Sequence, residues 1–116
     1  MNDPQEKVAP DDFRELTELH DMASHACDLL KAMANEWRLI ILCQLSEGEK
    51  TVSELQSVLG LSQSALSQHL AVLRREKIVS ARKSAQSVFY SLAGDEATKV
   101  METLHELFCG ARANKD

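Results

Sequence analysis

Cysteine, proline and aromatic residues are scarce in this chain of 116 residues, and long apolar runs are missing. Its three cysteines form no C-x-C or C-x-x-C pair, which excludes both a disulfide framework and a zinc finger. No apolar run approaches the length that spans a bilayer, and the acidic first residues, MNDPQEKVAPDD, are unlike a signal peptide. We therefore expect a cytoplasmic protein with no membrane contact, in a compartment where thiols stay reduced.

Both prolines lie within the first eleven residues, and we expect residues 1–11 to form a flexible arm. Residues 12–112 are enough for one domain, but small enough that a partner subunit would help to complete the core. The apolar content of 44% and the charged content of 27% are those of an ordinary globular protein. The sequence therefore predicts a single domain, without internal repeats or low-complexity segments.

Apolar residues recur at helical spacing along most of the chain and predict five helices. These helices are expected over residues 13–33, 35–47, 51–60, 62–76 and 94–112. Asn35 and Ser62 are the predicted N-caps of the second and fourth helices. Thr51 or one of its neighbours is the predicted N-cap of the third, with Glu54 near the capping-box position. The second helix, NEWRLIILCQL, is apolar almost all round, so we expect it to be deeply buried.

The segment IVSARKSAQSVFYSL, residues 78–92, has a different character. It is rich in β-branched and aromatic residues, and Val88, Tyr90 and Leu92 alternate, which predicts two strands around RKSAQS. A short helix, a second helix and a basic hairpin make up the winged helix-turn-helix arrangement, so the expected fold is mostly α with a small β-hairpin. Because a small core leaves apolar faces of the first and last helices uncovered, we expect a homodimer through these N- and C-terminal helices.

The net charge of −5 argues at first against a nucleic-acid partner, but the charge is unevenly distributed. Between residues 62 and 92 there are five cations and one carboxylate, a local balance of +4, so the rest of the chain carries −9. A basic segment in an acidic body indicates DNA binding more strongly than the whole-chain charge opposes it. A solvated basic face with no partner has the same composition and remains the alternative.

The stretch SQSALSQHLAVL, residues 62–73, places a polar strip beside a leucine stripe on one helix. Leu66, Leu70 and Leu73 are expected to face inward. The opposite surface carries hydroxyls and flat amides, which a slim helix in a major groove uses to bond base edges. His69 lies between the faces, where packing or a phosphate contact suits it better than ligand binding. The candidate residues for contacts to bases and phosphates are Thr51, Ser53, Gln63, Ser64, Ser67, Gln68, His69, Arg74, Arg82 and Lys83.

The sequence SQSALSQHLAVLRREKIVSARKSAQSVFYSL resembles the recognition helix and wing of the ArsR family of bacterial repressors, and LLKAMANEWRLIILCQL resembles that family's buried second helix. The resemblance covers roughly residues 27–110. It implies a homodimer that binds double-stranded operator DNA of two-fold symmetry and leaves it when an inducer is sensed. One departure is the wing turn, where many members have a glycine and this chain has Ser84, Ala85 and Gln86.

The metal-sensing patterns of that family are missing from this chain. The third helix, VSELQSVLG, has no C-x-C motif, and the last helix offers Asp95 and a single His105 at a separation unlike the zinc-type pattern. Because a metal needs three or four convergent ligands, we expect no metal site and no other cofactor. Cys43 and Cys109 instead resemble the two sensing thiols of the family's persulfide-responsive branch (repressors of the SqrR and BigR type), which implies a persulfide or polysulfide inducer. Cys27 has no counterpart in that pair and is expected to pack in the first helix.

Several alternatives stay open. The same DNA-binding protein would sense peroxide through a simple disulfide, or a metal ion bound by thiolates. A thiol oxidoreductase needs a resolving cysteine adjacent to its nucleophile, which this sequence lacks, so we do not expect an enzyme. A winged helix that binds only proteins would show no salt-dependent affinity for an operator.

Overall fold

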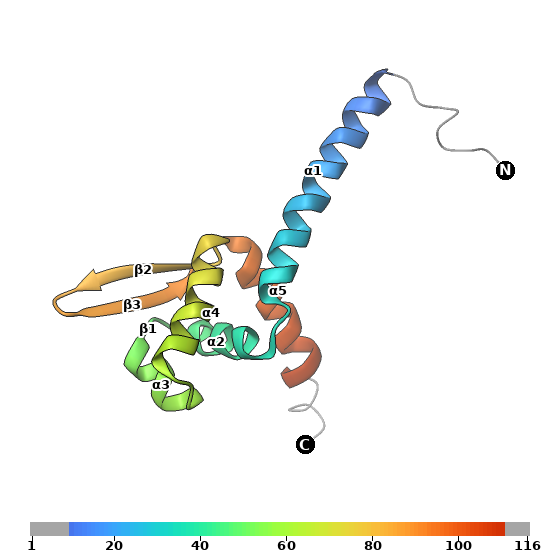
Figure 1. Ribbon diagram of the computed structural model, residues 1–116. Helices are drawn as coiled ribbons and strands as arrows, with labels where there is room; N and C mark the ends of the chain where they lie inside the picture. Colours follow the sequence, from blue (N-terminus) through green and yellow to red (C-terminus); the bar gives the residue numbers. More distant parts are fainter. Residues whose placement is uncertain (1–9, 111–116) are drawn as a thin grey trace.

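The structure, a computed structural model, describes residues 10–110, in which five α-helices and three strands form the domain (Figure 1). The elements are α1 (Pro10–Met33), α2 (Glu36–Ser46), β1 (Lys50–Thr51), α3 (Val52–Leu59), α4 (Gln63–Arg75), β2 (Val79–Ser84), β3 (Ser87–Leu92), α5 (Asp95–His105) and the π-helical turn η2 (Glu106–Gly110). This order confirms the winged helix-turn-helix fold, with β2 and β3 as the wing. The arm predicted over residues 1–11 lies outside the described residues except for its last two residues, which belong to α1.

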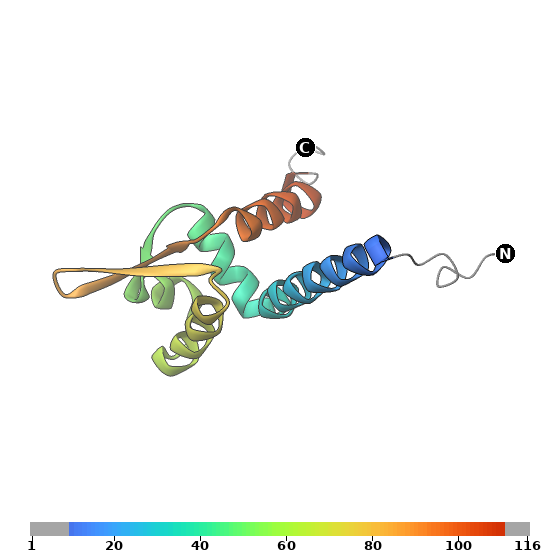
Figure 2. The ribbon, with the colours of Figure 1, turned by 90° about the horizontal axis from the view of Figure 1, so that it is seen from above.

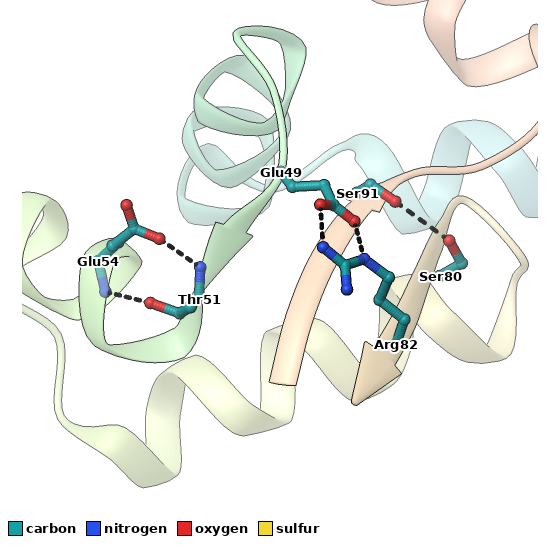
Figure 3. A network of polar contacts seen from close by, with 6 residues as sticks. All are labelled: Glu49, Thr51, Glu54, Ser80, Arg82 and Ser91. Atoms are coloured by element: carbon teal, nitrogen blue, oxygen red, sulfur yellow. Dashed lines mark hydrogen bonds and ion pairs between the residues drawn. The ribbon is translucent and has the colours of Figure 1, made fainter. Parts of the chain in front are cut away.

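Side-chain caps fix where three of the helices begin. Asn35 and Ser62 each accept a hydrogen bond from the backbone N–H three residues further on, at 3.0 and 3.1 Å. At α3, Thr51 Oγ1 accepts from the Glu54 N–H at 3.1 Å, and Glu54 Oε1 accepts from the Thr51 N–H at 2.8 Å (Figure 3). This reciprocal pair is a capping box. All three predicted N-caps are confirmed, and each stabilises its helix by about 1 kcal/mol.

The leucine stripe of α4 lies in the centre of the hydrophobic core. Leu66, Leu70 and Leu73 are at most 1% exposed, as predicted. They form one cluster with buried apolar side chains of the neighbouring elements, among them Ile41, Leu42, Leu45, Leu55, Ile78, Val79, Ala97 and Met101. Because burying one leucine stabilises the fold by about 1.5–3 kcal/mol, the stripe holds the opposite, polar face of α4 in a fixed orientation.

The sheet has three strands in the order β1-β3-β2, one more than the predicted hairpin. Strands β2 and β3 pair antiparallel from Val79 opposite Leu92 to Ser84 opposite Ser87, which confirms the wing. Strand β1 pairs with the other edge of β3 and connects the wing to the start of α3. In the wing turn Ala85 has φ 57°, in the left-handed region that favours glycine.

One face of α2 is open, so the expectation that this helix is deeply buried holds for one side only. Ile41, Leu42 and Leu45 are at most 3% exposed, whereas Trp37 and Ile40 are each 40% exposed. The physical reason is that the core covers one side of α2, and a single chain leaves part of its other side in contact with solvent.

Helix α1 projects away from the rest of the described chain, on the side opposite to the wing (Figures 1 and 2). Its apolar side chains Leu16, Leu19, Met22 and Leu30 fall within one helical stripe and are 50–66% exposed. Leu107 and Phe108 in η2 are similarly exposed. Although α1 has 24 residues, no described helix is apolar enough over sufficient length to cross a membrane.

Candidate DNA-binding surface and cysteine cleft

The polar strip of α4 lies on the molecular surface. Gln63, Ser64, Ser67 and Gln68 are all exposed, and Arg74 is exposed in the last turn of the helix. Because the leucines on the opposite side are buried, the strip faces away from the domain. Its amides and hydroxyls match the donors and acceptors that base edges present in a major groove.

His69, between the strip and the core, contacts an arginine of α2. Its Nδ1 lies 3.5 Å from Nη1 of Arg38, whose Nε and Nη2 donate to the carbonyl oxygens of Ala32 and Lys31 at the end of α1. Burial, and then the Arg38 cation, lower the pKa of His69 below its ordinary value. A neutral, half-buried imidazole suits packing better than a phosphate contact. The sequence offers no signal for Arg38, because its partner in α4 is 31 residues away.

Thr51 and Ser53 lie at the N-terminus of α3. Ser53 is exposed, whereas the hydroxyl oxygen of Thr51 already accepts the capping hydrogen bond. Hydrogen bonds from the backbone and from the side chain of Thr51 lower the pKa of Glu54, so the Thr51 hydroxyl is already engaged within the chain. The helix dipole favours an anion at this end.

The wing carries two neighbouring cations on β2, and one of them is engaged within the chain. Lys83 is exposed. Arg82 donates from Nε and Nη2 to the two carboxylate oxygens of Glu49, each at 2.7 Å (Figure 3), and its Cζ lies 4.6 Å from the centroid of the Phe89 ring. The hydrogen bonds from Arg82 hold the pKa of Glu49 below its usual value, so this carboxylate is ionised at neutral pH.

Cys43 on α2 and Cys109 in η2 line the same cleft, which has a volume of about 680 Å³. Both are free thiols on the surface. The other lining side chains are Ser46, Glu47, Met101, Glu102, His105 and Glu106. Cys27 is also a free thiol, but it is exposed on α1. The expectation that Cys27 packs is therefore wrong, because α1 projects away from the core.

The ionisation of Cys43 depends on burial and on two neighbouring groups of the cleft. Burial raises the pKa of the Cys43 thiol above its ordinary value, and negative charge on Cys109 and on Glu47 raises it further. Cys43 is therefore predominantly a thiol at neutral pH. Among the described residues, no three or more His, Cys, Asp or Glu side chains are placed to hold a metal ion together.

Comparisons with known proteins agree with this architecture. Residues 35–81 match the model of a family described as bacterial regulatory protein, arsR family. The chain is 55% identical over 96 residues to the transcriptional activator HlyU of Vibrio cholerae, covering 83% of this chain and 89% of that protein. It is 40% identical over 99 residues to the biofilm growth-associated repressor of Agrobacterium fabrum, covering 85% of each.

Solved structures give the same result. Reduced HlyU from Vibrio cholerae superposes with a TM-score of 0.77 at 55% identity, over 79% of this chain and 97% of that one. A homodimeric winged helix-turn-helix DNA-binding domain from Mycobacterium bovis, described as a possible ArsR-family transcriptional regulator, superposes with a TM-score of 0.70 at 25% identity, over 76% of this chain and 82% of that one. With a winged helix-turn-helix fold and relatives named as transcriptional regulators rather than enzymes, this chain belongs to the ArsR family of bacterial regulatory proteins.

Proposed function

We propose that this regulator is a homodimeric repressor that releases operator DNA when persulfides or related reactive sulfur species modify Cys43 and Cys109. The single observation that carries the sensing part is the shared cleft. Two free thiols that are far apart in the sequence, on α2 and in η2, line one cavity, and negative charge on Cys109 raises the pKa of Cys43. A ligand that reacts with sulfur is therefore able to join the two elements.

The DNA-binding part rests on the exposed face of α4 and on the wing. Gln63, Ser64, Ser67 and Gln68 supply contacts to bases, and Arg74, Lys83 and the start of α3 supply contacts to phosphates. Two such helices, one from each subunit, have to be about 34 Å apart to enter successive major grooves. The exposed apolar stripe of α1, together with Leu107 and Phe108 of η2, supports a dimer that sets this separation.

The sulfur chemistry needs no oxidant beyond the persulfide itself. A cysteine thiolate attacks the outer sulfur of a low-molecular-weight persulfide RSSH, the S–S bond breaks, and the thiol RSH leaves while a protein persulfide Cys–S–SH forms. When both cysteines carry a persulfide, the terminal sulfur anion of one attacks the Sγ atom of the other cysteine. The bond from that Sγ to its outer sulfur breaks, hydrogen sulfide leaves, and a trisulfide remains between Cys43 and Cys109. The persulfide is reduced to its thiol and to hydrogen sulfide, and the two protein thiols are oxidised.

An inserted sulfur matters because a bridge has a limited span. A direct disulfide requires Cα atoms within about 7 Å, and each additional sulfur adds roughly 2 Å to the reach. Two thiols that line a cleft too wide for a disulfide are still joined by a chain of three or four sulfurs. This difference separates the proposed inducer from peroxide, which yields a disulfide alone.

A gel-shift titration on the protein's own promoter tests the proposal. The samples are reduced protein, protein treated with glutathione persulfide, and the treated variants Cys43→Ser and Cys109→Ser, with Cys27→Ser as the matched control. We expect treatment to release DNA from the wild type and from Cys27→Ser, and to leave both cleft variants bound. Persistent binding by treated wild-type protein would refute the sensing role.

Mass spectrometry of the peptides joined between Cys43 and Cys109 identifies the inducer. Inserted sulfur atoms would support a persulfide inducer. A plain disulfide formed with peroxide would instead indicate a peroxide sensor, and unmodified peptides with a bound metal ion would indicate a metal sensor. Transcription from the bound promoter is measured in parallel, because one of the relatives is named an activator. A repressor gives more transcript after treatment, and an activator gives less.

A further inference from the structure

Arg82 of the wing is held by a carboxylate that has the shape of its expected DNA partner. Glu49, in the loop between α2 and β1, receives both donors of the Nε–Nη2 edge at 2.7 Å (Figure 3). A carboxylate and a phosphate both offer two oxygens to an arginine fork. The side chains of Arg82 and Glu49 are 56% and 38% exposed, so a phosphate is able to approach the pair.

The sheet fixes this arrangement across all three of its strands. Arg82 on β2 is opposite Phe89 on β3, and Thr51 of β1 is opposite Phe89 on the other side. The guanidinium therefore lies over the ring of the middle strand and reaches Glu49, just before β1. The ring determines where the cation lies, and the carboxylate determines which edge of the fork is occupied.

We propose that Glu49 is an intramolecular substitute for phosphate, which occupies Arg82 in the free protein and is displaced from it when the wing binds DNA. This inference rests on the proposed DNA-binding function, and it adds a residue that opposes binding. A bidentate phosphate contact through the Nε–Nη2 edge of Arg82 then requires that its bonds to Glu49 break first. Glu49 lowers the affinity for any duplex, and it keeps the wing cation neutralised when no DNA is bound.

The expected size of the effect follows from the exposure of the pair. Exposed ion pairs contribute about 0.2–1 kcal/mol, and a bidentate pair belongs near the upper end. Removing the competitor is therefore expected to raise affinity by up to about five-fold, the fold-change that corresponds to 1 kcal/mol. Removing the cation is expected to make the dependence of log K on log salt shallower by about 0.9, the value for one phosphate contact.

A double-mutant cycle on the reduced protein tests the proposal without any sulfur reagent. Operator affinity is measured over a range of salt concentrations for the wild type, Glu49→Gln, Arg82→Gln and the double variant. We expect Glu49→Gln to bind about two- to five-fold more tightly than the wild type, and to have no effect when Arg82 is also replaced. Glu49→Asp keeps the charge but shortens the reach, and is expected to behave like Glu49→Gln.

Two controls separate this mechanism from others. Glu47→Gln removes a carboxylate two residues away, whose nearest cation is Lys50 at 3.7 Å, and measures the general effect of charge in this loop. The proposal is wrong if Glu49→Gln acts equally in both Arg82 backgrounds, if it weakens binding, or if Arg82→Gln leaves the salt dependence unchanged. Failure of the proposed function itself would look different, because the wild-type protein would then show no salt-dependent operator binding at all.

Discussion

Replacing Leu19 by glutamate is expected to break the proposed dimer. Leu19 lies in the middle of the apolar stripe of α1 and is 59% exposed in the single chain. If this stripe is the interface, a second subunit covers the exposed part of Leu19, and two-fold symmetry places the substitution on both sides of the contact. Glutamate then loses the apolar contact and brings an unpaired carboxylate into the interface.

The structure sets the size of this effect. Full burial of a leucine gives about 1.5–3 kcal/mol, so covering the exposed 59% gives roughly 1–2 kcal/mol for each copy. The two copies together lose about 2–4 kcal/mol, which raises the dimer dissociation constant by roughly 30- to 1000-fold. The desolvation of the carboxylates adds to this loss.

Sedimentation equilibrium over a range of protein concentrations measures the dissociation constant directly. The matched control is Val58→Glu, since Val58 is also 59% exposed but lies on α3, away from the stripe. We expect this control to remain dimeric and Leu19→Glu to become monomeric at micromolar concentration while its circular dichroism spectrum is unchanged. A dimer that survives Leu19→Glu with the affinity of the wild type would refute the assignment of this stripe to the interface.

Three further predictions concern the core, the wing and the cleft. Leu70→Ala in the 1%-exposed stripe should lower the free energy of unfolding in urea by about 2–5 kcal/mol, and a loss below about 1 kcal/mol would show that this core repacks. Ala85→Gly should raise the free energy of unfolding by about 0.5–1 kcal/mol in thermal melts, because φ 57° strains an alanine; destabilisation would contradict this conformation. Glu47→Gln removes a charge that raises the pKa of Cys43, so the midpoint of Cys43 alkylation by iodoacetamide should move to lower pH, and an unmoved midpoint would show that burial and Cys109 act alone.

Features that depend on neighbours in the sequence were predictable. The caps at Asn35, Thr51 and Ser62 rest on hydrogen bonds that span three residues, and the inward leucines rest on helical spacing alone. Both are local, so composition and periodicity are sufficient to identify them. The wing follows similarly from the alternation in residues 87–92.

Features that depend on tertiary neighbours were not predictable in the same way. Strand β1 has two residues, too few for any periodicity, and it exists because β3 offers a free edge. Arg38 and Glu49 find their partners 31 and 33 residues away. The place of Cys43 and Cys109 in one cleft was implied by a family resemblance, because no spacing rule connects the C-terminal part of α2 with η2.

Helix α2 connects the two halves of the proposed mechanism. It carries Cys43 in the cleft, and near its beginning Arg38 contacts His69 of α4. Across the cleft, Cys109 directly follows Phe108, one of the exposed apolar residues of η2. A sulfur bridge under the proposed function would pull η2 toward α2, and Phe108 would have to move with Cys109.

A bridge between Cys43 and Cys109 would therefore first change the contact between the two subunits, and only through that contact the DNA-binding surface. The leucines of α4 are buried in the core, and the cleft lies at the edge of that core. A bridge in the cleft would therefore leave the core intact, and each recognition helix would keep its orientation within its own subunit. What changes is the position of one subunit relative to the other, and operator binding depends on a separation of about 34 Å between two recognition helices. An isolated half-site contacts one such helix alone. The bridged protein should therefore lose affinity for the full two-fold operator, but bind a half-site as weakly as the reduced protein does. Equal losses of affinity on both duplexes would instead show that the bridge changes α4 itself.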